Sequence, residues 1–129
     1  MPEHYDAIII GAGQAGPPLA ERLGRAGYRT AIIERHLLGG TCVNVGCIPT
    51  KTLVGSARIA WAARQAAEFG VVIDGPVGVD MKRVKARKDE VAGASNAGVT
   101  NWVDGMKNVT LIRGHARFTG PRALTVNDQ

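Results

Sequence analysis

The first third of the chain alternates short apolar runs with a helical pattern. Residues 5–10 and residues 30–34 are apolar runs of the length typical of strands. Between these runs, apolar residues recur at spacings of three and four, as on one face of a helix, at Ala15, Leu19, Leu23 and Ala26. Gly27 follows at the position where helices commonly end. The pattern predicts a strand–helix–strand unit at the amino terminus.

The middle of the chain predicts two further helices. Residues 52–69 mix apolar and charged faces and end at Gly70. A turn-rich link over residues 71–78 follows, and Asp80 is a suitable N-cap for a long helix over residues 81–105. The candidate buried positions of this long helix are Met81, Val84, Val91, Trp102 and Val103.

The last part of the chain predicts strands over residues 109–113 and 123–126, joined through a turn at residues 119–121. All 129 residues fit within one small domain. We therefore expect an α/β chain without internal repeats or low-complexity segments.

A glycine motif lies between the first strand and the first helix. Residues 11–16 read G-x-G-x-x-G, and the second strand ends in Glu34, 18 residues beyond Gly16. This is the context of a dinucleotide-binding fingerprint. Gly11 permits the tight turn, Gly13 lets a pyrophosphate approach the backbone, and Gly16 allows close packing of the helix. The helix start would offer N–H groups to phosphate, and Glu34 would accept hydrogen bonds from ribose hydroxyls. The alternatives are a plain strand-to-helix turn and a solvated carboxylate at a strand end.

The only two cysteines, Cys42 and Cys47, lie in the block GGTCVNVGCIPTK at residues 39–51. A pair this close closes too short a loop to constrain the fold, so redox chemistry and metal binding are its natural uses. Zinc needs two further ligands, and His4, His36 and His115 show no paired spacing. A pair of inert buried thiols is the third interpretation, and the glycines, asparagine and proline around the pair argue against it.

The spacing of the two cysteines constrains the backbone. Residues i and i+5 of an ideal helix lie about 8.6 Å apart, whereas a disulfide needs Cα atoms within about 7 Å. If Cys42 and Cys47 pair, the backbone between them must depart from an ideal helix, which Asn44 and Gly46 would tolerate. A helix start and the nearby Lys51 would lower the pKa of the thiols.

These two motifs together resemble those of the FAD-dependent pyridine nucleotide–disulfide oxidoreductases, a family that includes dihydrolipoamide dehydrogenase, glutathione reductase and mercuric reductase. The resemblance covers essentially the whole chain. It implies a Rossmann-like FAD-binding domain with a parallel sheet. It also implies an enzyme that passes electrons between NAD(P)H and a disulfide-type or metal-ion substrate, through FAD and a redox-active disulfide.

The resemblance assigns roles in the cysteine block. Cys47 corresponds to the thiol beside the flavin, which forms the charge-transfer contact, and Cys42 to the interchange thiol that meets the substrate. Lys51 corresponds to a lysine near the flavin N5 edge, although an exposed helix-end cation is the plain alternative. Gly40 and Thr41 are implied cofactor contacts. No metal site is expected.

The resemblance also assigns an adenosine side. Gly11, Gly13 and Gly16 correspond to the FAD fingerprint and Glu34 to the acid on the adenosine ribose. Residues 113–116 correspond to a stretch whose backbone lies against the adenine, so we expect His115 and Ala116 as cofactor contacts rather than His115 as a catalytic base.

Family members are several times longer than one domain. They carry a second fingerprint for NAD(P)H, a returning part of the FAD domain, and a dimer-interface domain with a His–Glu pair. The resemblance therefore implies that residues 1–129 are the amino-terminal part of an FAD-binding domain, inactive alone and belonging to a homodimer that acts on a small molecule. The alternative is a stand-alone, non-catalytic nucleotide-binding or thiol module.

The formal net charge of +5 owes much to a basic run at residues 82–88. Such a run is most often a solvated helix face. Aromatic residues do not interleave with it, so we expect no nucleic-acid partner. There is no run of 18 apolar residues, and residues 1–4 lack the basic start of a signal peptide. We therefore expect no membrane partner and a cytoplasmic location.

Overall fold

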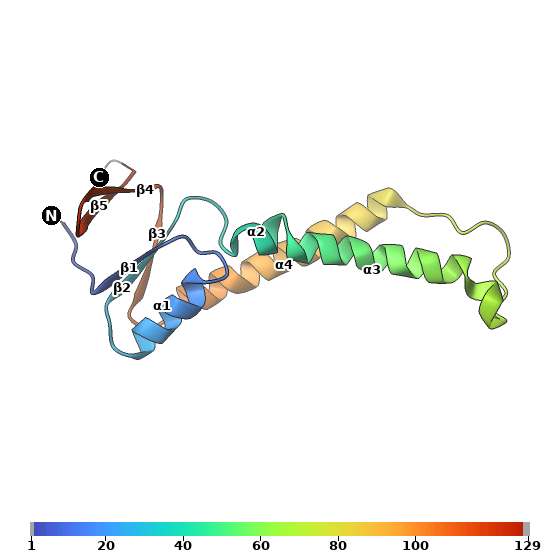
Figure 1. The fold of residues 1–129 in the computed structure, drawn as a ribbon, viewed down its shortest axis with the longest axis horizontal. Helices are drawn as coiled ribbons and strands as arrows, with labels where there is room; N and C mark the ends of the chain where they lie inside the picture. The colour runs from blue at the N-terminus through green and yellow to red at the C-terminus, as the bar shows by residue number, and fades with distance from the viewer. Residues whose placement is uncertain (1, 128–129) are drawn as a thin grey trace.

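The structure is a computed structural model that describes residues 2–127 (Figure 1). Strands β1 (Ala7–Ile10), β2 (Thr30–Glu34) and β3 (Val109–Arg113) form one parallel sheet with β2 at its centre. The register pairs Ala7 with Thr30, and Thr30 in turn with Val109. The predicted α/β fold with a parallel sheet is confirmed.

The core lies on one face of this sheet. Ile32 of β2 packs there with Ala20 of helix α1 (Gly16–Arg25) and Val103 near the end of helix α4 (Met81–Asp104), and all three are at most 1% exposed. On the opposite face of β1, Ile8 and Ile10 are 40% and 49% exposed. Parallel sheets are normally covered on both faces; here the second face is exposed at β1, whereas Ala31 and Ile33 of β2, which pair with Ile8 and Ile10, are at most 1% exposed.

Helix α1 turns a different face to the sheet than its apolar spacing predicts. Its buried residues are Gly16, Pro17, Ala20 and Gly24. Leu19, on the predicted face, is 49% exposed. The reason is close packing: a Cβ added at Gly24 would overlap the carbonyl oxygen of Lys107. A stripe of small residues therefore brings α1 against the sheet.

Gly27 ends α1 as predicted. Its φ is +90°, its N–H donates to the Gly24 carbonyl at 3.1 Å, and the Tyr28 N–H donates to the Leu23 carbonyl at 3.1 Å. These two bonds form a Schellman motif, for which a left-handed glycine is the usual residue.

The cysteine block forms two helices, α2 (Gly40–Asn44) and α3 (Cys47–Arg64), and the 3₁₀ helix η1 (Ala66–Phe69) follows. The predicted helix over 52–69 therefore begins five residues too late and is interrupted at Gln65. The break between α2 and α3 falls at Val45 and Gly46, where the backbone leaves helical angles.

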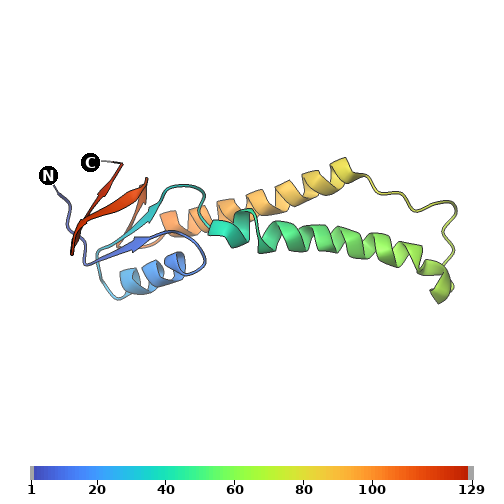
Figure 2. The same cartoon turned by 45° about the horizontal axis from the view of Figure 1, so that its top comes forward.

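Helices α3 and α4 lie side by side and extend away from the sheet as an arm (Figures 1 and 2). Helix α4 begins as predicted, because the Asp80 carboxylate accepts hydrogen bonds from the N–H groups of Lys82 and Arg83 at 2.9 and 3.1 Å. Most of the positions of α4 that were predicted to be buried are not, because only α3 packs along α4 in the arm. Val103 is 1% exposed, Val84 is half-buried, and Met81, Val91 and Trp102 are 63%, 37% and 39% exposed.

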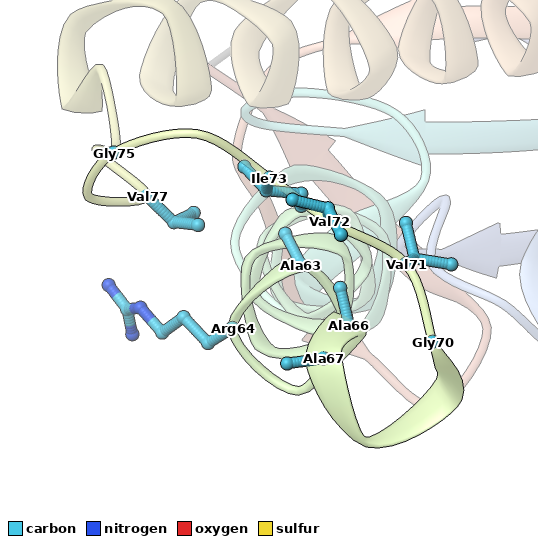
Figure 3. A pocket seen from close by; sticks show the side chains of 10 residues that line it. All are labelled: Ala63, Arg64, Ala66, Ala67, Gly70, Val71, Val72, Ile73, Gly75 and Val77. Carbon is cyan, nitrogen blue, oxygen red and sulfur yellow. The ribbon is translucent and has the colours of Figure 1, made fainter.

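At the far end of the arm, η1 and the link that follows it border an open cavity of about 440 Å³ (Figure 3). Its lining is mainly alanine, valine and isoleucine, with Arg64 as the one charged side chain. None of the predicted site residues lies there. Within the described residues, no helix is both long and apolar enough to span a bilayer.

Strands β4 (Ala116–Gly120) and β5 (Ala123–Val126) form a separate antiparallel hairpin. Strand β4 is absent from the sequence prediction. Thr119 and Gly120 of the predicted turn belong to β4, and the turn from β4 to β5 lies at Pro121 and Arg122. The expectation that residues 119–121 join the strand at 109–113 to the strand at 123–126 is therefore wrong. Strand β3 belongs to the parallel sheet, and Gly114 leads from it into the hairpin.

Candidate nucleotide and redox site

The glycine turn joins β1 to α1 and leaves one side of its backbone open. Gly11 has a φ of +100°, and its N–H donates to the Ile33 carbonyl at 2.7 Å. A Cβ at Gly16 would overlap the Gly11 carbonyl oxygen, so the helix start packs directly on the turn. A Cβ at Gly13 would meet no protein atom within 4 Å. Gly16 therefore serves close packing, whereas Gly13 borders free space that a ligand can approach.

The start of α1 offers few backbone N–H groups to an anion. Pro17 and Pro18 lie in the first turn of α1 and have no N–H. Ala15 precedes Gly16 without a side-chain cap. Gly16 and the turn before it are therefore the N–H donors that this end of α1 can present to an anion.

Glu34 at the end of β2 is bonded to the glycine turn. Its Oε2 accepts the N–H of Ala12 and its Oε1 the N–H of His36, both at 2.8 Å. Partial burial alone would raise the pKa of Glu34, but the backbone N–H groups of Ala12, His36 and Arg35 outweigh burial and hold this pKa below its usual value. Glu34 therefore stays ionised and fixes the turn, and its carboxylate, with about four acceptor sites, keeps capacity for a further donor.

A cavity of about 310 Å³ beside the turn brings together four predicted site residues, Gly11, Glu34, His115 and Ala116. The link from β3 to β4 lies against the end of β2, where the Gly114 N–H donates to the Glu34 carbonyl at 3.0 Å.

Asn127 holds the link between β3 and β4 in place, and it was not singled out from the sequence. Its Oδ1 accepts the N–H of His115 at 2.9 Å, and its Nδ2 donates to the Arg113 carbonyl at 3.3 Å. Its φ is +53°, a conformation that asparagine tolerates. The one indication in the sequence was an asparagine directly after the last strand, a residue type that tolerates a positive φ.

The cysteine block lies directly against the glycine turn. The Gly39 N–H donates to the Ala12 carbonyl at 2.7 Å, and Gln14 Nε2 donates to the Gly39 carbonyl at 3.0 Å. Gly40 has a φ of +62°, and a Cβ there would lie 2.9 Å from the Cα of Gly13. The two motifs thus form one continuous site. Gln14 is a structural link that the motif, which leaves its position free, does not specify.

The two cysteines are free thiols on either side of the helix break. Cys42 lies in α2 and is half-buried, and Cys47 is the first residue of α3 and is exposed. A hydrogen bond to the Cys47 side chain, assisted by burial, raises the pKa of the Cys42 thiol, against the opposing effects of the Cys47 N–H and the charge of Lys51. The expected lowering of the pKa is therefore wrong for Cys42.

Thr41 and Lys51 are both exposed. The carbonyl of Thr41 accepts the Val45 N–H at 3.0 Å and closes the single turn of α2. Lys51 lies one turn beyond Cys47 on α3, on the side of the site that carries the sulfurs. Among residues 2–127, no three His, Cys, Asp or Glu side chains are grouped to hold a metal ion.

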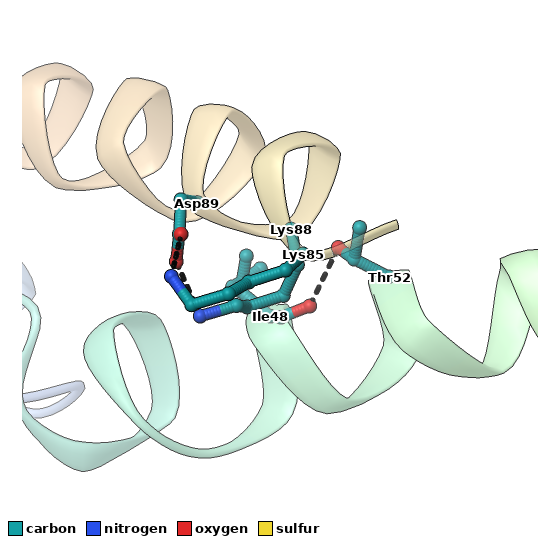
Figure 4. A network of polar contacts seen from close by, with 5 residues as sticks. All are labelled: Ile48, Thr52, Lys85, Lys88 and Asp89. Atoms are coloured by element: carbon teal, nitrogen blue, oxygen red, sulfur yellow. Dashed lines mark hydrogen bonds and ion pairs between the residues drawn. The ribbon is translucent and has the colours of Figure 1, made fainter. Parts of the chain in front are cut away.

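The basic run lies on the first turns of α4, where acids of the same helix pair with it. Lys85 Nζ lies 2.6 Å from Asp89, and Lys88 also pairs with Asp89, next to Ile48 and Thr52 of α3 (Figure 4). Arg87 Nη1 donates to the Thr52 carbonyl at 3.0 Å. Part of this run therefore attaches α4 to α3.

A parallel sheet, a glycine turn bonded to an acid, and a cysteine block that lies against that turn are the features of a dinucleotide-binding α/β unit. The pyridine nucleotide-disulphide oxidoreductase family matches residues 5–125, and the chain belongs to this family.

Individual relatives agree with this assignment. Dihydrolipoyl dehydrogenase of Rhizobium etli is 41% identical over 126 residues, which cover 98% of this chain and 26% of that protein. The enzyme of the same name from Acholeplasma laidlawii is 37% identical, and the match covers 38% of that protein. The HOCl-induced flavoprotein disulfide reductase RclA from Escherichia coli superposes with a TM-score of 0.78 at 37% identity, over 95% of this chain and 25% of that one. The chain thus spans about a quarter to two fifths of these relatives.

Proposed function

We propose that this chain is the FAD-binding and disulfide-bearing part of a flavoprotein disulfide oxidoreductase. The observation that carries the proposal is the direct contact between the cysteine block and the glycine turn, through the Gly39–Ala12 hydrogen bond and the close approach of Gly40 to Gly13. A phosphate-binding turn and a reactive thiol pair thereby share one site.

The residues present fit FAD. The free space at Gly13 suits a pyrophosphate against the backbone. Glu34 has spare acceptor capacity for the ribose hydroxyls, and the cavity lined by His115 and Ala116 suits the adenine. Gly40, Thr41 and Lys51 would lie toward the flavin. When bound, FAD supplies the two-electron chemistry that links a nicotinamide to a disulfide.

The thiol pair supplies the protein's own redox step. As a disulfide, Cys42 and Cys47 accept two electrons and two protons and become the dithiol that the structure contains. Cys47 begins α3 and is the proposed sulfur beside the flavin, whereas Cys42 is the proposed sulfur for exchange with substrate. The name of the disulfide reductase RclA supports a disulfide-type substrate, and the name of the family supports a pyridine nucleotide, NAD(P)H, as the electron donor. A metal ion is the other proposed substrate class. A homodimer in the cytoplasm, without nucleic-acid or membrane partners, completes the proposal.

The test is purification of the complete gene product. We expect a yellow protein that releases FAD on denaturation and, with NADH or NADPH, reduces lipoamide, glutathione disulfide or mercuric ion. A colourless protein that binds NAD at the Gly11–Gly16 turn would contradict the proposal and favour a stand-alone nucleotide-binding module.

A further inference from the structure

Two asparagine side chains meet on one buried carbonyl oxygen next to the redox pair. Asn96, in the middle of α4, donates from Nδ2 to the Leu38 carbonyl at 2.7 Å and to Asn44 Oδ1 at 3.1 Å. Asn44, at the end of α2, donates from Nδ2 to the carbonyls of Leu38 and Gly40, both at 2.9 Å. These residues, Leu38, Gly40, Asn44 and Asn96, form what we call the amide cluster.

The chemistry of the partners fixes both amide orientations. Backbone carbonyls only accept hydrogen bonds, so each side chain must present its NH₂ group to Leu38 or Gly40. All four N–H bonds of the two amides are then used, and the Leu38 carbonyl accepts two of them. Leu38 is 1% exposed. Removal of the Asn96 amide would leave the Leu38 carbonyl with the Asn44 bond alone and would remove the donor to Asn44 Oδ1, so two hydrogen bonds would be lost.

The amide cluster holds the segment that carries Cys42. Helix α2 has five residues, too few for a helix to be stable by itself. On one side the segment is fixed to the glycine turn through Gly39 and Ala12. On the other side, Asn96 attaches it to the long helix of the arm. Cys47 belongs to a different helix, which Val45 and Gly46 link to α2, and these two attachments fix the other sides of the segment that carries Cys42.

We propose that Asn96 is a positioning residue that keeps Cys42 within bonding reach of Cys47 and so stabilises the disulfide relative to the dithiol. This inference rests on the redox role in the proposed function. Two thiols that are already held together lose less conformational freedom on forming an S–S bond than two mobile ones, so their effective concentration is higher. In exchange with oxidised dithiothreitol, the S–S bond of the reagent breaks as the Cys42–Cys47 bond forms. Two electrons and two protons pass to the reagent, which leaves as a dithiol.

The experiment compares Asn96→Leu with Asn101→Leu in the complete gene product. Asn101 lies on the same helix, is exposed, and makes no side-chain hydrogen bond among the described residues. Each protein is equilibrated in dithiothreitol redox buffers, quenched by alkylation, and its oxidised fraction is read by mass. We expect the exchange constant of Asn96→Leu to fall about tenfold, equivalent to a potential about 30 mV less negative, and that of Asn101→Leu to be unchanged.

A second variant guards against a folding defect. Asn96→Thr is small and lacks the amide donors, so it is expected to show the same shift, with Asn101→Thr as its control. The FAD content of both Asn96 variants should match the wild type, since Asn96 itself does not line the cavity beside the glycine turn. An unchanged exchange constant in a folded Asn96 variant, or an equal shift in the Asn101 controls, would overturn the inference. The exchange measurement needs no flavin turnover, so a protein without FAD or NAD(P)H activity would refute the proposed function and still test Asn96.

Discussion

Three glycines of the same region separate packing from cofactor binding. A Cβ at Gly13 meets only free space, a Cβ at Gly24 overlaps the Lys107 carbonyl oxygen, and a Cβ at Gly16 overlaps the Gly11 carbonyl oxygen inside the phosphate-binding turn. Substitution of each glycine by alanine therefore adds the same methyl group to three different surroundings.

The expected effects follow from these surroundings. Gly24→Ala should lower the free energy of unfolding by about 1–3 kcal/mol, the usual cost of overpacking, with little effect on FAD. Gly13→Ala should leave the free energy of unfolding unchanged or raise it slightly, because the φ of Gly13 is not in the left-handed region. Its methyl group would hold the pyrophosphate off the backbone, and the loss of one charge-assisted hydrogen bond of about 1.5–3 kcal/mol weakens FAD binding about 10- to 150-fold. Gly16→Ala should show both losses.

The assay pairs urea unfolding of the apoprotein with titration of FAD by flavin fluorescence. The two measurements together decide the roles of the glycines. If Gly13→Ala destabilised the fold as much as Gly24→Ala while its FAD dissociation constant stayed at the wild-type value, the open space at Gly13 would not be the cofactor path.

Glu34→Gln should weaken FAD binding at least tenfold. The pKa of Glu34 is lowered on folding, so its contribution to the free energy of unfolding is complete above the pKa of the unfolded chain and is lost as the pH falls through the pKa of the folded chain. The difference in stability between the wild type and Glu34→Gln should therefore shrink below about pH 4.5. A difference that stays constant down to pH 3 would argue against this role. Cys42→Ser in the complete protein should keep the long-wavelength charge-transfer absorption after reduction and lose disulfide turnover, whereas Cys47→Ser should lose both, and identical spectra would show that the two roles are wrongly assigned. The 129-residue chain alone should self-associate, because side chains such as Phe69 and Val72 are 78% and 86% exposed. It should also bind FAD weakly and show no NAD(P)H-dependent disulfide reduction, because it spans only about a quarter of its relative from Rhizobium etli. Size-exclusion chromatography and flavin titration check this, and a cooperative monomer with tight FAD binding would contradict it.

The amino-terminal unit could be predicted because its signals are local. The glycine turn, the acid at the end of β2 and the glycine that ends α1 depend on backbone angles and on neighbours within a few residues. The departure from helix between Cys42 and Cys47 was predicted only on the condition that the two form a disulfide, and the break at Val45 and Gly46 is present with both cysteines as free thiols.

The remaining features depend on contacts that spacing does not encode. The apolar face of α1 is exposed and its small residues are buried, because the distance between helix and sheet decides the outcome. The core positions predicted for α4 assumed a third layer that the arm lacks. The bonds of Asn96 and Asn127 join residues far apart along the chain, which a single sequence does not pair.

The order of the sheet has a consequence for synthesis on the ribosome. Strand β2 is the central strand, yet one of its two neighbours, β3, begins only at Val109. Residues 35–108 must be translated first, which takes on the order of 4–15 s at about 5–20 residues per second. Throughout that interval the apolar strand β2 has one unpaired edge, the kind of edge that recruits strands from other chains. The length of residues 35–108 therefore sets how long β2 of a nascent chain can pair with a strand of another nascent chain on the same messenger RNA.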